Sequence, residues 1–463
     1  MRAIFIIFRN SDYRYLAPVV REGLKRGHAV ECWHDCDQPT GVKAYSFARL
    51  ENVPNFPDVG KPMTRVFHGK KDLKQKLILE KGIDVVFASS IFHHVFPQTR
   101  LDIFSFEWAT VMTGFDNLDE MTRVHVPLPN DREQMFFVHT EMMLKEGKRF
   151  LAELKPEHAV HLDAQCRDSR IVGTSEFDSF QDITNPQELR LRFKIPSGKN
   201  VLLYLPFAYS NLNQHSAWER AFYGFYMSTK KTKDHVYLHH QRRNILENSL
   251  YKAWHLYKIS GDQVARQYFL KGINIEKVFN AVRDFCDKNN LYLVVKPRLK
   301  NPLAEIVKKK ADLIVWDDES RQNPPVLKEL LAISRLCISY SSSAIRAAAF
   351  AKVFTLNIRL PEIYYPDAIS RFWYSDEEGS LFNFPGAVSN WSIEDVICDL
   401  RDAPLERFVV DSKARDQYIR NFIGFDDCST SSRIFDILED KMKAKSEKSS
   451  IKTYAQEGSG SGK

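Results

Sequence analysis

The sequence predicts an α/β protein with two parallel sheets, and three observations support this fold class. Short apolar runs of strand length alternate with amphipathic stretches of helix length along most of the 463 residues, as in repeated βαβ units. Several apolar runs end in small polar residues, as parallel strands do where they lead into a helix. A chain this long exceeds what one hydrophobic core usually supports, so two domains of roughly 200 residues each are expected.

The N-terminal segment has the clearest βαβ pattern. An apolar run over 3–8 predicts a strand, and apolar residues at helical spacing predict a helix over 17–26, closed by Gly27. A second apolar run, 29–33, predicts the next strand and ends in polar residues. We expect these two strands to be parallel neighbours, because a helix separates them.

The remaining elements of the first half complete a domain that we predict to span 1–165. Apolar residues recur at three- and four-residue intervals over 133–153, which predicts a long amphipathic helix. The other predicted elements are a helix over 73–80 and strands over 84–89 and 104–112.

A second α/β domain is predicted over 166–440. It opens with RIVGTSEFDSF at 170–180, which we interpret as a short strand, a glycine turn and an acidic-aromatic loop. The stretch 209–289 is rich in Tyr, Phe, His and Lys and is expected to be a mostly helical insertion. The other predicted elements are strands within 200–207, 291–298, 312–318, 336–340 and 353–358, and helices over 325–334 and 344–351.

The C-terminal residues are predicted to form one helix and then a tail. Serine and threonine residues at 429–432 offer helix caps before an amphipathic stretch that reaches 442. The segment 441–463 is rich in Lys, Ser and Gly and ends in GSGSGK. We therefore expect a flexible tail there, outside the fold.

Composition indicates a globular protein of a reducing compartment. Hydrophobic residues make up 44% of the chain and aromatic residues 12%, which is too apolar for disorder. No continuous apolar span approaches the ~20 residues that cross a bilayer, and the opening MRAIFIIFRN is interpreted as a strand and not a signal peptide. The seven cysteines are scattered, which favours the cytoplasm.

The net charge of +7 comes from basic residues that crowd 220–243, 296–310 and the tail after 440. Such an excess suits a phosphorylated ligand, or peripheral binding to the anionic inner face of a membrane. Nucleic acid is disfavoured as a partner, because the aromatic residues between the basic ones have the spacing of a helix core.

The polar turn after the apolar run 330–338 is the strongest candidate site. Tyr340, Ser341, Ser342 and Ser343 follow the predicted strand, and a helix of small residues begins at Ala344. Three hydroxyls and the amides at the start of a helix suit a phosphate group. The alternative for any single serine is an ordinary helix N-cap.

The order of several segments resembles a known group of enzymes. The segments VGTSEFDSF, KIPSGKNVLLYLP, LYLVVKPR, LLAISRLCISYSSSAIRAAAFAK and DDCSTSSRI resemble the C-terminal half of GT-B glycosyltransferases of bacterial surface-polysaccharide biosynthesis, including the CDP-glycerol glycerophosphotransferase-like enzymes. The resemblance covers roughly 165–440. It implies two facing Rossmann-like domains, the second of which holds the nucleotide donor.

The resemblance also implies an activity. It implies a glycosyltransferase that works without a metal or a separate cofactor and moves a sugar from a nucleotide donor to a cell-envelope or lipid-linked glycan. CMP- and CDP-linked donors are favoured, since related enzymes that use CMP-activated acidic sugars often hold the single phosphate with paired serines. A CMP-Kdo transferase is the sharpest version of this hypothesis.

One departure from the pattern narrows the chemistry. The glycerophosphotransferases typically carry a Lys-Pro-His-Pro turn, whereas this chain has Lys296, Pro297, Arg298 and Leu299. Arginine cannot act as a general base at neutral pH but can neutralise a phosphate. Lys296 and Arg298 are therefore expected to bind donor phosphates, with two solvated surface charges as the alternative, and glycerophosphate transfer is disfavoured.

Glycosyl transfer also requires a group that accepts the acceptor's proton or attacks the sugar. The candidates are Asp234 and His239, which lie in a cluster of titratable residues, and Glu107, which is expected near the carboxyl end of a strand. The alternative for each is a structural or solvated charge. Three other functions stay open: a glycerophosphate transferase, disfavoured by the missing histidine, a non-hydrolysing sugar-nucleotide epimerase on the same fold, and a non-catalytic scaffold of polysaccharide assembly.

Overall fold

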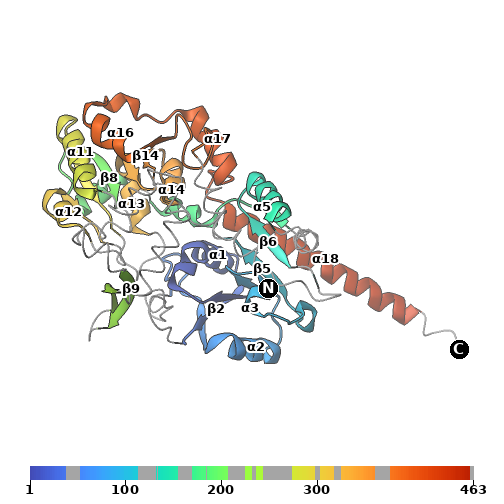
Figure 1. Cartoon of the computed structure of the whole chain (residues 1–463). Helices are drawn as coiled ribbons and strands as arrows, with labels where there is room; N and C mark the ends of the chain where they lie inside the picture. Colours follow the sequence, from blue (N-terminus) through green and yellow to red (C-terminus); the bar gives the residue numbers. More distant parts are fainter. Residues whose placement is uncertain are drawn as a thin grey trace.

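The computed structural model of the chain contains two parallel α/β sheets and one separate antiparallel hairpin (Figure 1). This confirms the predicted α/β class with two Rossmann-like domains, the arrangement expected of a GT-B protein. The structure describes residues 1–37, 53–112, 132, 134–154, 169–183, 185–206, 225–231, 236–242, 274–297, 303–316, 325–359 and 376–458.

The first sheet has seven parallel strands in the order β3-β2-β1-β4-β5-β6-β7. The central strands β1, β4, β5 and β6 are buried on both faces, because helices cover both sides of a doubly wound sheet. One face packs on α1 (Tyr13–Lys25) and the other on α2 (Gly69–Leu79) and α3 (Phe92–Val95). The strands are β1 (Arg2–Ile7), β2 (Ala29–Asp35), β3 (Met63–Phe67), β4 (Val85–Ala88), β5 (Glu107–Val111), β6 (Met135–Val138) and β7 (Ser169–Ile171).

The second sheet has six parallel strands in the order β12-β11-β8-β13-β14-β15. The strands are β8 (Asn200–Leu205), β11 (Leu291–Val295), β12 (Leu313–Ile314), β13 (Ser334–Ser339), β14 (Phe354–Ile358) and β15 (Val388–Trp391). The helices are α7 (Pro186–Arg192), α11 (Ile275–Lys288), α12 (Glu305–Lys310), α13 (Val326–Ala332), α14 (Ala344–Phe350), α16 (Ile393–Asp399) and α17 (Ser412–Phe422).

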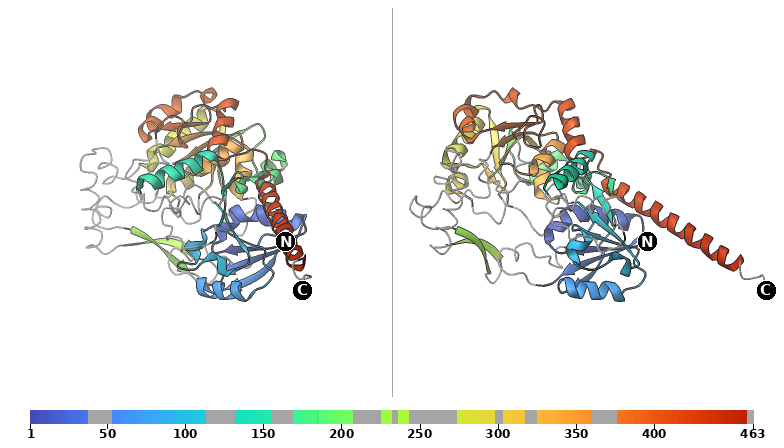
Figure 2. Two further views of the ribbon diagram at one scale, coloured as in Figure 1. Left: turned by 90° about the vertical axis from the view of Figure 1, so that its right-hand side faces the viewer. Right: turned by 45° about the vertical axis from the view of Figure 1, so that its right-hand side comes forward.

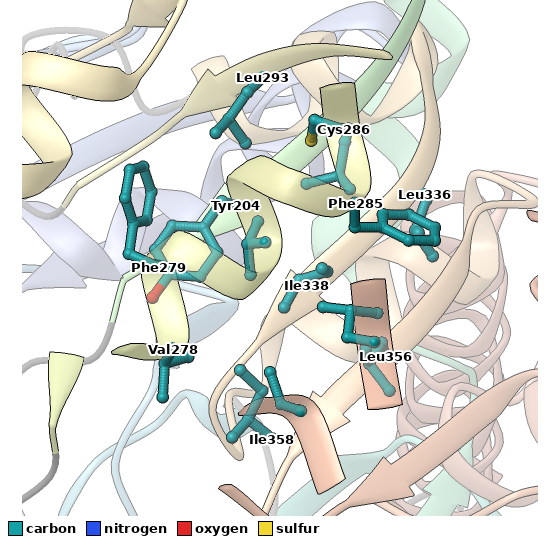
Figure 3. Close-up of a cluster of buried hydrophobic side chains, with 14 of the residues drawn as sticks. Tyr204, Val278, Phe279, Phe285, Cys286, Leu293, Leu336, Ile338, Leu356 and Ile358 are labelled. Carbon is teal, nitrogen blue, oxygen red and sulfur yellow. The ribbon is translucent and has the colours of Figure 1, made fainter. Parts of the chain in front are cut away.

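The core of the second domain lies on both faces of this sheet. Figure 3 shows one half, where Phe279 and Phe285 of α11 pack against Tyr204, Ile338 and Leu356 from the strands. On the other face, α7, α13 and α14 cover the same strands. The two layers bury the central parts of β8, β11, β13 and β14, so polar side chains at the strand ends gather at the edges of the sheet.

Two predicted helical segments contain strands. The predicted helix over 133–153 is a strand, β6, followed by the helix α5 (Glu141–Leu154). The four residues of β6 are all buried between β5 and β7. The prediction missed this strand because a short continuous apolar run cannot be distinguished from part of a buried helix by its periodicity. Within the expected helical insertion, β9 (Phe225–Lys231) and β10 (Val236–Arg242) form an antiparallel hairpin, because aromatic and β-branched residues favour strands.

The C-terminal helix changes the predicted domain division at 165 and 440. β7 pairs with β6 in the first sheet, and α18 (Thr430–Gly458) packs its buried residues Ile434, Phe435 and Leu438 in the core of the first domain. Both elements therefore belong with the first domain. The expected flexible tail is helical as far as Gly458, and Figure 2 shows this part of α18 extending beyond both sheets. No helix in the described part of the chain combines the length and apolar character that a membrane crossing requires.

Candidate functional site

The serine turn, residues Ser341–Ser343, connects the carboxyl end of β13 to α14. Ser341 has a φ of 38°, which lies in the left-handed region that a serine rarely adopts. Its amide donates a hydrogen bond of 2.6 Å to Oδ1 of Asn357 on the neighbouring strand β14. This bond holds the chain where it reverses direction at the edge of the sheet.

Part of the hydrogen-bonding capacity of the serine turn is used within the turn. The Ser342 hydroxyl accepts a bond of 3.3 Å from the amide of Ala344. Ser343 occupies the N-cap position of α14, but its side chain caps no amide. Among the residues that the structure describes, the amides of Ser342 and Ser343 and the hydroxyls of Ser341 and Ser343 have no hydrogen-bond partner. Four donors are thus available to a ligand.

Tyr340 supports the serine turn from the interior. Its hydroxyl lies 2.8 Å from the hydroxyl of Tyr204 at the end of β8, and both side chains are buried. Burial raises the pKa of both phenols well above their ordinary value, so both stay neutral. The tyrosine pair fixes the end of β13 to the centre of the sheet, and a direct contact between Tyr340 and a ligand stays a prediction.

Lys296 lies at the same edge of the sheet as the serine turn. It follows β11 directly, and its amide donates a bond of 3.1 Å to the carbonyl of Tyr204. Since β8 lies between β11 and β13, the structure brings Lys296 and the serines to one edge, as predicted for parallel strands. The Lys296 side chain is buried. Arg298 lies outside the described residues.

Of the three predicted catalytic residues, the structure describes His239 and Glu107, and neither lies at a strand end of this edge. Asp234 lies outside the described residues, and His239 belongs to β10 of the hairpin, which joins neither parallel sheet. Glu107 is the first residue of β5 and is in register with Val85, the first residue of β4. It therefore lies at the amino edge of the first sheet. The expected position near the carboxyl end of a strand was wrong, because the strand begins at Glu107 itself.

Glu107 has a structural partner in the C-terminal helix. Its carboxylate accepts a hydrogen bond from Lys445 and lies 3.4 Å from the ammonium of Lys441. Burial alone would raise the pKa of the Glu107 carboxyl, but these ammonium groups outweigh burial and hold its pKa below the usual range. We therefore withdraw Glu107 as a catalytic candidate and interpret it as an anchor of α18.

The helix after the serine turn connects the two domains. Arg346 of α14 donates a hydrogen bond of 3.2 Å to Nδ1 of His139, which follows β6. His139 Nε2 lies 2.7 Å from the carbonyl of Met112, which follows β5. A carbonyl only accepts and a guanidinium only donates, so the ring carries its proton on Nε2. Burial and the nearby Arg346 lower the pKa of His139 to about 3. The serine turn is thus next to the carboxyl edge of the first sheet.

A buried carboxylate, Glu176, lies at the joint between the domains. Arg14 of α1 forms an ion pair of 2.9 Å with it, and Lys328 of α13 donates to its backbone carbonyl and to Ser179. Burial would raise the pKa of Glu176, but Arg14, Lys328 and Arg346 together lower it to about 2. Sequence reasoning found the acidic joint but neither these cations nor His139 and Asn357. A polar Asn357 inside the apolar run FTLNI was the available signal.

Metal ligands do not gather in the described part of the chain. No group of three or more His, Cys, Asp or Glu side chains lies close enough there to hold a metal ion. A reaction without a metal stays a prediction.

Comparison with solved structures gives distant likenesses in fold. A putative UDP-N-acetylglucosamine 2-epimerase from Listeria monocytogenes is 13% identical, with a TM-score of 0.49 over 96% of this chain and 97% of that one. The S. aureus MnaA–UDP structure is 14% identical, with a TM-score of 0.49 over 96% and 97%. The wall teichoic acid polymerase TagF, soaked with CDPG, is 11% identical, with a TM-score of 0.49 over 96% and 90%.

No protein-family model matches this sequence, and no curated protein matches it. At these identities and TM-scores, the solved structures assign the chain to no family. The two-sheet topology therefore rests on the strand order of the chain itself.

The buried neutral His139 predicts a pH dependence of stability. Below the ordinary histidine pKa of about 6.5 the unfolded chain takes up a proton, while folded His139 stays neutral until about pH 3. The free energy of unfolding should therefore fall as the pH falls through this window. Between pH 6.5 and 5.0 the wild type should lose roughly 1–2 kcal/mol more than His139→Gln in urea unfolding. Equal losses in both proteins would contradict a neutral buried ring.

The anchoring role of Glu107 predicts a mild, purely structural effect of its removal. Glu107→Gln keeps the side-chain shape but removes the charge that faces Lys441 and Lys445. We expect the free energy of unfolding to fall by about 1 kcal/mol or less, because both lysines reach solvent. Nucleotide affinity and turnover should match the wild type. A lost turnover with unchanged stability would restore Glu107 as a catalytic residue.

Proposed function

We propose that the protein is a glycosyltransferase that binds the phosphate of a nucleotide-activated sugar at the serine turn. The observation that carries this proposal is the set of four open hydrogen-bond donors of Ser341, Ser342 and Ser343. They lie at the carboxyl edge of a parallel sheet, which is where ligands bind in open α/β folds. Consecutive backbone amides in a turn form an anion-binding concavity.

The same donors suit the leaving group of a glycosyl transfer. An acceptor hydroxyl oxygen forms a bond to the anomeric carbon, and the bond from that carbon to the phosphate oxygen breaks. The electron pair leaves with the phosphate, and the hydroxyl proton passes to a base. The turn donors and the Lys296 ammonium would stabilise the charge that develops on the phosphate. Asp234 and His239 stay the predicted candidates for the base. This scheme needs no metal or separate cofactor.

For the donor, we favour a CMP- or CDP-linked sugar, and CMP-Kdo is the sharpest form of the proposal. A short turn with two amides and two hydroxyls suits one phosphate group, and the acidic sugar would add a carboxylate that basic residues attract. The acceptor would be a cell-envelope or lipid-linked glycan. The basic segments support an acceptor at the inner face of a membrane.

Nucleotide binding tests this proposal. We expect CMP or CDP to raise the melting temperature of the full chain, and Ser343→Ala and Lys296→Met each to weaken binding about tenfold, because each removes one donor to a charged group. Lys199→Met is the matched control, since Lys199 precedes β8 at the opposite edge of the same sheet and contacts Asn290. Its affinity should equal that of the wild type.

Two outcomes would overturn the assignment. If CMP, CDP, UDP and their sugars all leave the melting temperature unchanged, the turn is not a nucleotide site. If a bound nucleotide sugar is isomerised in the absence of any glycan acceptor, the protein is an epimerase. Nucleotide release that depends on an added glycan is the result expected of a glycosyltransferase.

A further inference from the structure

The strained residue of the serine turn is held by one buried side chain. Ser341 has a left-handed φ of 38°, a conformation that is unfavourable for a residue with a Cβ atom. The amide of Ser341 bonds Oδ1 of Asn357 at 2.6 Å. Asn357 is 1% exposed, and β13 and β14 pair Ser339 with Asn357. The strand register thus sets the asparagine beside the start of the turn.

Asn357 is itself oriented by a chain of hydrogen bonds along the edge of the sheet. Its Nδ2 donates to Oδ1 of Asn390 on β15 at 2.8 Å, and Nδ2 of Asn390 donates to Asp376 at 2.9 Å. The other oxygen of Asp376 accepts a bond of 2.8 Å from Arg359. We call these four residues, Asn357, Asn390, Asp376 and Arg359, the amide relay.

The amide relay has only one possible direction. An ionised carboxylate only accepts hydrogen bonds, so Asp376 must face Nδ2 of Asn390. Oδ1 of Asn390 then faces Asn357, whose Nδ2 must donate. This leaves Oδ1 of Asn357 pointing at the amide of Ser341, which can only donate. The acceptor Asp376 at one end and the donor amide of Ser341 at the other thus require the same orientation of both asparagines.

We infer that Asn357 is the positioning residue of the serine turn, oriented by the amide relay so that the turn is preformed for its ligand. This inference rests on the proposed function of the turn as a phosphate site. Asn357 holds Ser341 in its left-handed conformation, and the amides of Ser342 and Ser343 follow directly. A ligand then meets donors already in place and does not spend binding energy on ordering them.

A double-mutant cycle distinguishes a positioning role of Asn357 from a general loss of stability caused by its replacement. Asn357→Leu should weaken CMP or CDP binding at least tenfold, because an ordinary residue at 341 is no longer held at positive φ. Glycine adopts positive φ without that cost. In a Ser341→Gly background, Asn357→Leu should therefore weaken binding threefold or less. The same four proteins can be compared by urea unfolding, which needs no ligand. Asn357→Leu should lower the free energy of unfolding less in the Ser341→Gly background than in the wild type.

Thr355→Val is the matched control. Thr355 lies two residues earlier on the same strand and is fully buried, and its hydroxyl has no hydrogen-bond partner among the residues that the structure describes. Its replacement should leave nucleotide affinity unchanged. Equal effects of Asn357→Leu in both backgrounds, in binding and in unfolding, would overturn the positioning role. A wild type that binds no nucleotide would instead overturn the proposed function, while the unfolding cycle would still test the relay.

Discussion

The buried carboxylate of Glu176 is the constraint on which the arrangement of this molecule depends. A charge this deep is tolerated only when it is paired, and its cations come from both domains: Arg14 from α1, Lys328 from α13 and Arg346 from α14. Asp178, two residues on, accepts bonds from the first amides of α18, at Thr430 and Ser431. The joint therefore contacts four helices, α1, α13, α14 and α18. Separating the domains would leave several buried charges without partners.

This joint also decides where the candidate site lies. Arg346 belongs to the short helix that begins at the serine turn, and its second contact, His139, follows a strand of the first sheet. The apolar neighbours of Arg346 on α14, Ile345 and Ala349, pack in one cluster with Met112 and Val138. The edge of the second sheet that carries the serine turn and the carboxyl edge of the first sheet are thus linked through α14. A donor and an acceptor held at these two edges would lie on neighbouring surfaces.

Sequence periodicity predicted most of the fold, because strands buried on both faces are continuous apolar runs and their polar ends mark one edge of a sheet. It found the serine turn and Lys296 for this reason. It failed in two places. The short apolar run of β6 continues into the apolar pattern of α5, so the two were predicted as one helix. Glu107 could not be placed until the start of β5 was known. A polar residue inside an apolar run marks Asn357 as unusual, but its partner Ser341, like the partner Arg346 of His139, could not be predicted, because each pairing depends on which elements become neighbours.

The central claim is that the serine turn binds the phosphate of a nucleotide. A crystal structure of the full chain grown with CMP tests it most directly. We expect phosphate oxygens at hydrogen-bond distance, about 2.7–3.2 Å, from the amide nitrogens of Ser342 and Ser343, with Lys296 beside them and Ser341 unchanged in its left-handed conformation. A nucleotide whose phosphate lies elsewhere, with the serine turn open to solvent, would contradict the account.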